Sequence, residues 1–142
     1  MSDEIHDSPQ EWVAGHIKKY VESDGQEGYE WNGFPTLLLT TRGRKSGQLH
    51  RTALIYGQDG DHYVIVGSRG GSDHHPSWYL NLVANPEVQV QVKADKFKAL
   101  AHTASPEERA KLWPLMVKVF PRYAKYQEGT KREIPVIVLV RQ

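Results

Sequence analysis

The sequence has no cysteine among its 142 residues, which excludes disulfide bonds and any chemistry that depends on a thiolate. It also lacks a long apolar run, since no stretch approaches the roughly 20 apolar residues that a membrane-spanning helix needs. The N-terminal segment MSDEIHDSPQEW contains acids and no apolar core, so it does not resemble a secretory signal. We therefore expect a cytoplasmic protein, long enough to bury a hydrophobic core without covalent cross-links.

Acidic residues are absent from one long stretch of the chain. Between Glu30 and Asp59 there is no aspartate or glutamate, although the whole chain carries a net charge of only +1. A local field of one sign favours an anionic ligand, and a solvated basic loop would account for the same pattern. The cations of this stretch are Arg42, Arg44, Lys45 and Arg51.

Several kinds of active site are also missing. The chain has no HExxH motif and no facial triad of histidines and a carboxylate, and the adjacent His74 and His75 would not face one metal on a helix. Ser46 and His50 lack a third orienting group and the GxSxG elbow of hydrolases. No broad basic face or known nucleic-acid module is evident. We expect no metal site, no serine hydrolase and no nucleic-acid partner.

The N-terminal part is predicted to be a helix followed by a loop. Ser8-Pro9-Gln10-Glu11 has the form of a capping box with proline at the first helical position. Apolar residues then recur at helical spacing, which predicts an amphipathic helix over about residues 9–22. Glycines indicate a mobile loop from there to residue 34. We expect a single domain over residues 1–142, in which residues 1–34 precede a coenzyme-binding core at residues 35–142.

The rest of the chain predicts strands joined mainly by hairpins. Asp59-Gly60 is a strong hairpin signal. A short helix is expected from Pro76 to Asn85-Pro86, and a longer one after the capping box Ser105-Pro106-Glu107-Glu108. The predicted fold is α+β, mainly β, with about six antiparallel strands and three short helices closed as a barrel or roll. The expected strands cover residues 36–41, 51–57, 62–68, 88–92, 97–103 and 134–140.

Four short motifs carry candidate chemistry. The glycine-flanked basic loop at residues 43–47 can form an anion-binding nest, or be an ordinary basic loop. A strand that ends at Ser68 and is followed by two glycines can expose backbone groups to a flat ligand, or be a plain turn. Trp78 and Tyr79 can flank a ring, or be core residues. Tyr123 and Tyr126 can form an aromatic lid, or pack a helix end.

These motifs occur together and in order, which is more specific than any one of them. The segments LLLTTRGRKSGQ, RTALIYG, YVIVGSRGG and HPSWYLNLVANPEVQVQV, with the closing SPEERAKLWPLMVKVFPRYAKYQ, resemble the deazaflavin-dependent nitroreductase family of actinobacteria. The similarity covers about residues 35–142. It implies a split β-barrel related to flavin-reductase barrels, with reduced coenzyme F420 rather than FMN as the electron donor.

The resemblance also implies site residues. Positions that match the holders of the coenzyme's phosphate and glutamyl tail are Arg44, Lys45, Ser46 and Arg51, and Arg69 replaces a frequent lysine. The ring wall matches Ala53, Leu54, Val66, Gly67 and Ser68, and the short-helix side matches Trp78, Asn81, Ala84 and Asn85. Gly70, in the turn after Ser68, is a further candidate for coenzyme binding. The candidate catalytic residues are Ser68, Tyr123 and Tyr126. Phe120 stands where well-known nitroimidazole-reducing relatives have tyrosine, so a hydroxyl donor is lost.

The resemblance predicts an F420H2-dependent reductase of quinones, with menaquinone as a physiological acceptor and nitroaromatics or α,β-unsaturated lactones as others. Such chemistry belongs to the cofactor, while the protein holds two rings at near-attack distance and stabilises growing negative charge. Two alternatives stay open: an FMN- or haem-binding split barrel, and a carrier that binds F420 without turnover. We expect a monomer or homodimer, with weak association of the N-terminal helix at the inner face of the cell membrane as a further hypothesis.

Overall fold

The computed structural model describes residues 4–8 and 10–142. These residues form nine strands, four α-helices and one 3-10 turn. In chain order the elements are β1 (Ile5–Asp7), α1 (Glu11–Ser23), β2 (Glu30–Trp31), β3 (Phe34–Arg42), β4 (Leu49–Ile55), β5 (Gly57–Asp59), β6 (His62–Val66), η1 (Arg69–Gly71), α2 (Ser77–Ala84), β7 (Glu87–Val92), β8 (Asp95–Thr103), α3 (Pro106–Val119), α4 (Arg122–Glu128) and β9 (Val136–Arg141).

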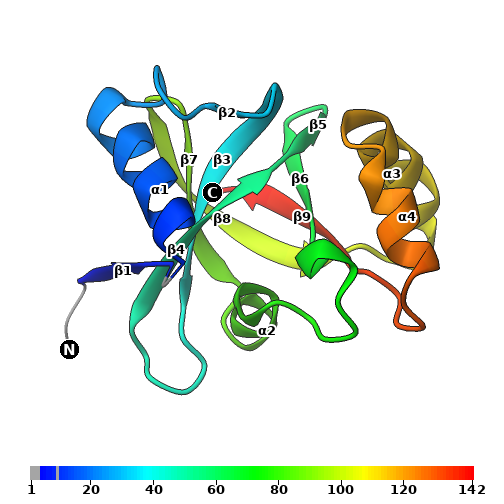
Figure 1. The fold of residues 1–142 in the computed structure, drawn as a ribbon. Helices are drawn as coiled ribbons and strands as arrows, with labels where there is room; N and C mark the ends of the chain where they lie inside the picture. The colour runs from blue at the N-terminus through cyan, green and yellow to red at the C-terminus, as the bar shows by residue number, and fades with distance from the viewer. Residues whose placement is uncertain (1–3, 9) are drawn as a thin grey trace.

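The strands form one curved sheet in the order β1-β4-β3-β7-β8-β9-β6-β5, with β2 added beside β3. All neighbours are antiparallel except β1 and β4. Figure 1 shows the sheet between α1 on one side and the α3–α4 pair on the other, with α2 at one end. The predicted split-barrel fold is therefore confirmed, with more strands than the six expected from the sequence.

A bend at Tyr56 links β4, near one end of this strand order, to β5 at the other end. β4 pairs with β3, whereas β5, which follows after one residue, pairs with β6 at the opposite end of the strand order. A strand that changes partners at a bend makes the corner of a barrel. Gly57 sits at the corner because α3 packs against it: a Cβ there would lie 2.7 Å from Met116 Sδ and 2.9 Å from Leu115 Cδ2.

Alternation along β9 explains why its sequence is apolar on both faces. Ile137 and Leu139 point into the barrel core, while Val136 and Val138 belong to a second cluster under α3 and α4. Successive strand side chains face opposite sides of a sheet, so the part of β9 that is covered on both sides, residues 136–139, has no polar positions. The helices α3 and α4 thus cover the outer face of the strands β6 and β9 (Figure 1).

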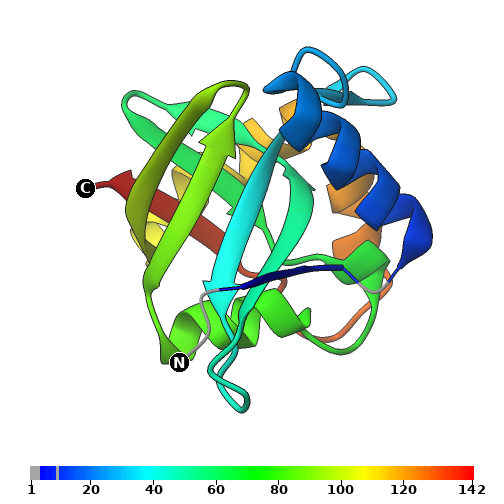
Figure 2. The ribbon, with the colours of Figure 1, turned by 90° about the vertical axis from the view of Figure 1, so that its left-hand side faces the viewer.

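Helix α1 covers another part of the barrel. Its buried residues Val13, Ile17 and Tyr20 pack against Leu38 of β3 and Ala53 of β4. The view in Figure 2 shows the helix lying across these two strands. None of the helices in the described part of the chain is long and apolar enough to cross a membrane.

The predicted start of α1 is wrong. The helix begins at Glu11 with Gln10 as its N-cap, and Gln10 makes no side-chain cap. Ser8 belongs to the strand side of this junction: its backbone N–H donates to Arg51 O at 3.0 Å, which extends the pairing of β1 with β4 by one residue, and its hydroxyl accepts from Gln10 N at 3.4 Å. Pro9, the expected first helical residue, lies outside the described residues.

Two other predictions need correction. The segment expected to be a loop before residue 34 contains β2, which pairs with the first residues of β3. The C-terminal helical region is split into α3 and α4, so the described residues hold four α-helices rather than three. The break falls at Phe120, whose backbone is extended, because proline at position 121 disfavours helical conformation in the residue before it.

The predicted capping box at the start of α3 is confirmed. The Ser105 hydroxyl accepts from Glu108 N at 3.2 Å, and Glu108 Oε1 accepts from Ser105 N at 2.9 Å. This backbone hydrogen bond, and then the hydrogen bond to His102, lowers the pKa of Glu108. A carboxylate with a lowered pKa in the folded state stabilises the fold above its ordinary pKa and loses that contribution as pH falls through the folded value.

We therefore expect Glu108→Ala to lower the free energy of unfolding, with a pH-dependent difference from the wild type. The difference should be constant from neutral pH down to about 4.5, the ordinary pKa of the group, and shrink below it as the wild-type carboxylate takes up a proton. Urea unfolding at several pH values measures it. Glu107→Ala, in the same turn but outside the capping box, is the control; an equal loss in both variants at every pH would contradict the prediction.

Candidate functional site

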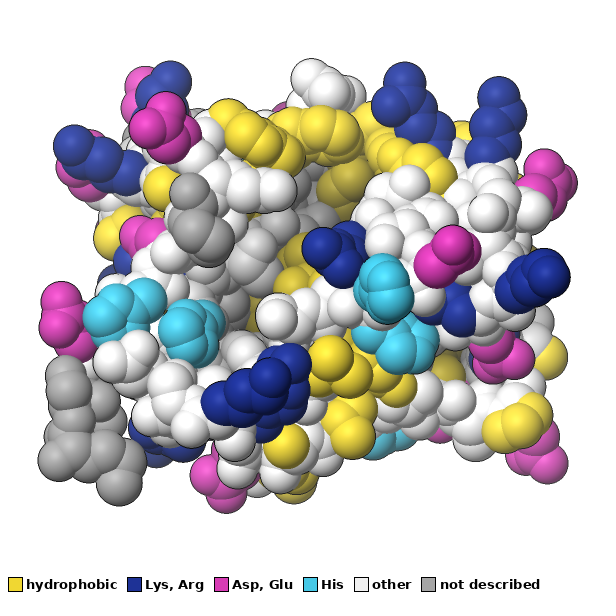
Figure 3. Space-filling model, turned by 60° about the horizontal axis from the view of Figure 1, so that its bottom comes forward, with side chains coloured by type: hydrophobic (Ala, Val, Ile, Leu, Met, Phe, Trp, Pro, Cys, Tyr) yellow, Lys and Arg dark blue, Asp and Glu magenta, His cyan; other side chains and the backbone are white. Residues whose placement is uncertain are grey.

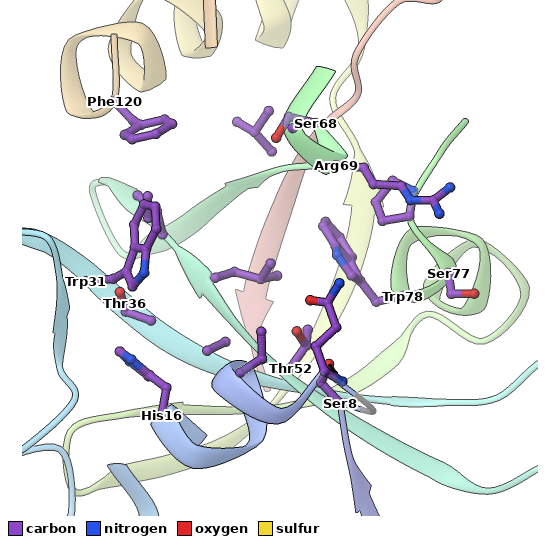
Figure 4. A pocket seen from close by; sticks show the side chains of 18 of the residues that line it. Ser8, His16, Trp31, Thr36, Thr52, Ser68, Arg69, Ser77, Trp78 and Phe120 are labelled. Atoms are coloured by element: carbon purple, nitrogen blue, oxygen red, sulfur yellow. Dashed lines mark hydrogen bonds between the residues drawn. The ribbon is translucent and has the colours of Figure 1, made fainter. Parts of the chain in front are cut away.

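A cavity of about 700 Å³ opens between α1, β4, the end of β6 and the α3–α4 junction. Figure 3 shows this hollow on one face of the molecule, with basic side chains on its rim. In Figure 4, Trp31 and Phe120 lie on one side of the space and Trp78 on the other, while Thr52 points in from β4. A largely apolar cavity of this size with a few polar groups is typical of a cofactor or substrate site.

One wall of the cavity is aromatic. Phe120 is the centre of this wall, with Trp31 at a ring-centroid distance of 6.3 Å, Tyr123 at 4.9 Å and Tyr126 at 6.2 Å. The three residues from the α3–α4 region come together because the break at Phe120 sets α4 at an angle to α3. Burial raises the pKa of Tyr123, so its phenol keeps its proton at neutral pH. The wall offers flat apolar surface and hydroxyl donors.

A second wall is polar; it comes from the turn after β6, which packs beside Tyr126. Ser68 has right-handed helical backbone angles (φ −78°, ψ −36°), and Arg69 has φ 47° in the left-handed region. A right-handed residue followed by a left-handed one brings successive N–H groups to one concave side, which is an anion-binding nest. Gly70, with φ 63° and ψ 21°, continues the turn. Ser68, Arg69 and Gly70 all line the cavity.

The basic loop between β3 and β4 lies beside the cavity at the start of α2. The backbone N of Arg44 and its Nη1 both donate to Asn81 Oδ1, at 3.2 and 2.8 Å, and Arg44 Nη1 also reaches Ser77 O at 3.5 Å. Ser77 lines the cavity, whereas the loop itself does not. Lys45 and Ser46 are exposed at the loop tip. The buried Asn81 therefore fixes the loop and does not line the cavity.

Arg51 is already engaged by another side chain. Its Nε donates to Asp7 Oδ1 at 2.6 Å and its Nη2 to Asp7 Oδ2 at 3.2 Å. This bidentate ion pair holds β1 against β4, with 20% and 30% of the two side chains exposed. The guanidinium predicted to contact the coenzyme thus faces β1 in this structure.

The structure brings together about half of the residues expected from the sequence. The predicted residues that line the cavity are Ala53, Leu54, Val66, Ser68, Arg69, Gly70, Trp78, Tyr123 and Tyr126. The predicted residues that do not line it are Arg44, Lys45, Ser46, Arg51, Gly67, Asn81, Ala84 and Asn85. Ala84 and Asn85 lie at the far end of α2, and Gly67 is buried against Pro135.

Sequence reasoning missed the N-terminal contribution to the site. Residues before β3 and the polar positions of β4 form much of the lining, namely Ser8, Gln10, Trp12, Val13, His16, Trp31 and Thr52. Trp12 and His16 are four residues apart on α1, so the helical spacing of an apolar and a polar ring on one face was a usable signal. The remaining positions carry no local signal, because they reach the cavity only through packing of α1 on the barrel.

Comparison with known proteins agrees with this architecture. The family model described as F420H(2)-dependent quinone reductase matches residues 12–141.

The chain belongs to this family.

A curated F420H(2)-dependent quinone reductase of Mycobacterium tuberculosis is 40% identical over 131 residues, covering 89% of this chain and 88% of the relative. A solved F420-H2 dependent reductase is 40% identical, with a TM-score of 0.69, covering 74% of this chain and 93% of that chain. A solved domain-swapped dimer is 37% identical, with a TM-score of 0.72, covering 93% of this chain and 99% of that chain. The resemblance inferred from the sequence is therefore confirmed.

The family is one of oxidoreductases defined by dependence on the reduced deazaflavin coenzyme F420. The side chains and backbone groups that line the cavity fit this coenzyme. Flat aromatic surface at Phe120 and Trp78 suits a conjugated ring, and the nest at Ser68 and Arg69 suits its electronegative oxygens. The exposed cations Arg44 and Lys45 lie on the side of the cavity that Ser77 borders. There they can attract the anionic tail of the coenzyme.

Proposed function

We propose that this protein binds F420H2 in the cavity and reduces a quinone. The observation that carries the proposal is the match of residues 12–141 to the quinone reductase family, in a chain whose cavity joins an aromatic wall to a nest of backbone donors. When bound, the reduced coenzyme supplies the hydride from one of its own carbon atoms. The protein needs no nucleophile of its own, which agrees with the absence of cysteine.

The chain's own residues then have three tasks. The aromatic wall of Trp31, Phe120 and Tyr126 orients a planar acceptor and excludes water from it. Ser68 and the neighbouring backbone amides stabilise negative charge that develops on an oxygen in the cavity. Tyr123, whose pKa burial raises, keeps its proton and supplies a hydrogen bond to the reduced acceptor. We assign Ser68, Tyr123 and Tyr126 to contact with the reacting molecules on this basis.

The basic loop serves the anionic end of the coenzyme in this proposal. Lys45 is exposed at the loop tip, and Arg44 is held toward the cavity rim by Asn81. Arg69 adds a further cation to the lining of the cavity. Arg51, which is paired with Asp7, acts on the site by holding β1 in place and so contributes less directly than the sequence predicted.

Reversing the charge of Lys45 tests this assignment. We expect Lys45→Glu to weaken coenzyme binding about tenfold at low ionic strength and by less at high salt, because the interaction is between exposed charges. Fluorescence titration of the coenzyme at several salt concentrations measures the effect. Lys118→Glu, an equal charge reversal on the exposed face of α3, should leave affinity unchanged; a salt-independent loss in Lys45→Glu would remove Lys45 from the anion site.

The acceptor we favour is menaquinone, with nitroaromatics and α,β-unsaturated lactones as other electron-poor substrates of the same cavity. Phe120 offers ring surface but no hydroxyl, so nitroimidazoles are expected to be poor acceptors. A lipophilic quinone would be met at the inner face of the membrane, and the exposed Trp12 at the cavity supports weak peripheral contact there. We place the protein in the cytoplasm otherwise.

The similarity to a solved domain-swapped dimer supports a homodimer rather than a monomer. We also propose that residues 1–142 form a single domain, made of an N-terminal segment of residues 1–34 and a coenzyme-binding core of residues 35–142. The lining residues contributed by α1 and β2 support that division of roles.

The first experiment is a titration of the purified protein with coenzyme F420 and, separately, with FMN. The reduced complex is then mixed with menadione, a soluble quinone, and reoxidation is followed at the deazaflavin absorbance band. We expect tight F420 binding, weak FMN binding and rapid reoxidation. Tight binding without reoxidation by any quinone would replace the reductase with a carrier, and preference for FMN would overturn the coenzyme assignment.

A further inference from the structure

Arg132, in the segment between α4 and β9, makes four hydrogen bonds to the turn that follows β6. Its Nε donates to Ser72 O at 2.7 Å and its Nη2 to Ser68 O at 2.7 Å. Its Nη1 donates to Gly67 O at 3.1 Å and to His75 Nδ1 at 3.0 Å. Arg132 does not line the cavity, whereas Ser68 and His75 do. The guanidinium therefore holds the polar wall from behind.

The hydrogen bonds of Arg132 decide where two backbone amides point. The described residues have no cis peptide bond, and in a trans peptide the C=O and the following N–H point in opposite directions. Because the carbonyls of Gly67 and Ser68 face Arg132, the N–H groups of Ser68 and Arg69 face away from it. Within the described part of the chain neither amide has a hydrogen-bond partner, so both donors of the nest are free.

The same contact fixes the tautomer of His75. A guanidinium can only donate, so Nδ1 of His75 must accept and the ring proton is on Nε2. Burial, and then the charge of Arg132, lowers the pKa of His75, which keeps the ring neutral at neutral pH. The ring also packs against Tyr79 at a centroid distance of 4.9 Å. No other residue in the described ranges hydrogen-bonds to Nε2.

We propose that Arg132 is a positioning residue that aims three donors, the amides of Ser68 and Arg69 and the Nε2–H of His75, at an electronegative oxygen of the molecule bound in the cavity. The inference rests on the proposed function for the identity of that molecule. It adds His75 and Arg132 to the polar side of the site. Donors held in place before the reaction stabilise developing charge without reorganisation.

The segment that carries Arg132 is itself anchored at several points. Gln127 Nε2 donates to Arg132 O at 2.7 Å, and Gln127 Oε1 accepts from Ile134 N at 2.9 Å. Thr130 Oγ1 donates to Asp73 Oδ1 at 2.8 Å, a second link to the same turn. A guanidinium on such a support can fix the direction of its acceptors, as a positioning role requires.

Arg132→Lys tests the proposal, because an ammonium keeps the charge but cannot span four acceptors with a planar fork. The matched control is Arg109→Lys. Arg109 donates to Ile134 O and to Gln127 Oε1, so it supports the same segment from α3 without contacting the turn after β6. Both variants are expected to unfold at lower temperature than the wild type.

Only Arg132→Lys should change the site. We expect its kcat with menadione to fall roughly 10- to 100-fold, with little change in the KM for the quinone. The expected loss is smaller than the roughly 100- to 1,000-fold that follows removal of a preorganised donor, because the amides are displaced and not removed. Arg109→Lys should keep both constants. If the two variants match in kcat, Arg132 is merely structural and the proposal is overturned.

A second readout does not depend on activity. In the wild type, the ¹⁵N spectrum of His75 should show a neutral ring protonated on Nε2, and the amide resonances of Ser68 and Arg69 should shift when F420 binds. Arg132→Lys should mix the two tautomers. A ring protonated on Nδ1, or unmoved amides in a protein that binds F420, would overturn the proposal. Failure of the wild type to bind F420 would overturn the proposed function instead, while the tautomer would still test the hold of Arg132 on His75.

Discussion

Replacing Thr52 with tryptophan is expected to abolish coenzyme binding while leaving the fold intact. Thr52 lines the cavity from β4, and its side chain points into the open space (Figure 4). A tryptophan there would fill the volume that a flat ring needs, and we expect affinity for F420 to fall by at least about 100-fold, or roughly 3 kcal/mol. Fluorescence titration measures the affinity, and thermal unfolding reports on the fold.

Thr52→Val is the matched control, because valine has nearly the shape of threonine without the hydroxyl. It should bind the coenzyme almost as the wild type does. Near-normal binding by Thr52→Trp, in a protein that binds F420, would place the coenzyme outside this cavity. A loss in both variants would show that the hydroxyl, and not the space, matters.

Removing the hydroxyl of Tyr20 should lower the free energy of unfolding by much more than the loss of one small exposed group would. Tyr20 is fully buried, and its hydroxyl donates to Thr36 O at 3.0 Å and accepts from Lys93 N at 2.7 Å. Tyr20→Phe leaves a backbone donor without its partner, for which we expect a loss of about 2 kcal/mol in the free energy of unfolding. That corresponds to a drop of roughly 5 to 10 °C in Tm. Denaturant and thermal unfolding both measure it.

Tyr63→Phe is the control for this deletion. Tyr63 is half-buried and stacks on Phe97 at 5.4 Å, and its hydroxyl has no hydrogen bond within the described residues. The same chemical change should therefore alter stability by less than about 0.5 kcal/mol. Equal losses in the two variants would mean that the hydrogen bonds of Tyr20 contribute nothing specific to docking α1 on the barrel.

The features predicted from the sequence are those with a local cause. Ser105 and Glu108 form their capping box within one turn of helix, and Asp59-Gly60 lies at the hairpin between β5 and β6. α2 ends just before Pro86, because proline disfavours helix in the residue before it. The order of the motifs was enough to recognise the family and its coenzyme. Phe120 before Pro121 was an equally local signal for the break between α3 and α4, and the sequence analysis missed it.

The site depended on contacts between distant parts of the chain. Arg51 pairs with Asp7 across 44 positions, and Arg132 reaches Ser68 across 64. From the sequence alone, each arginine could be a ligand-binding cation or a solvent-exposed side chain. Only the residue with which it pairs in the folded protein decides between these roles. Such pairs form when strand pairing, of β1 with β4 and of β6 with β9, brings distant segments of the chain together.

Residue types and spacing thus determined most of the longer helices and strands, the family and the coenzyme class, because helix caps, turns and strand alternation act over a few residues. The tertiary structure alone decided which face of α1 covers the cavity, which cations remain free for an anion, and which way the amides after β6 point. Those outcomes depend on packing and hydrogen bonds that no short stretch of sequence encodes.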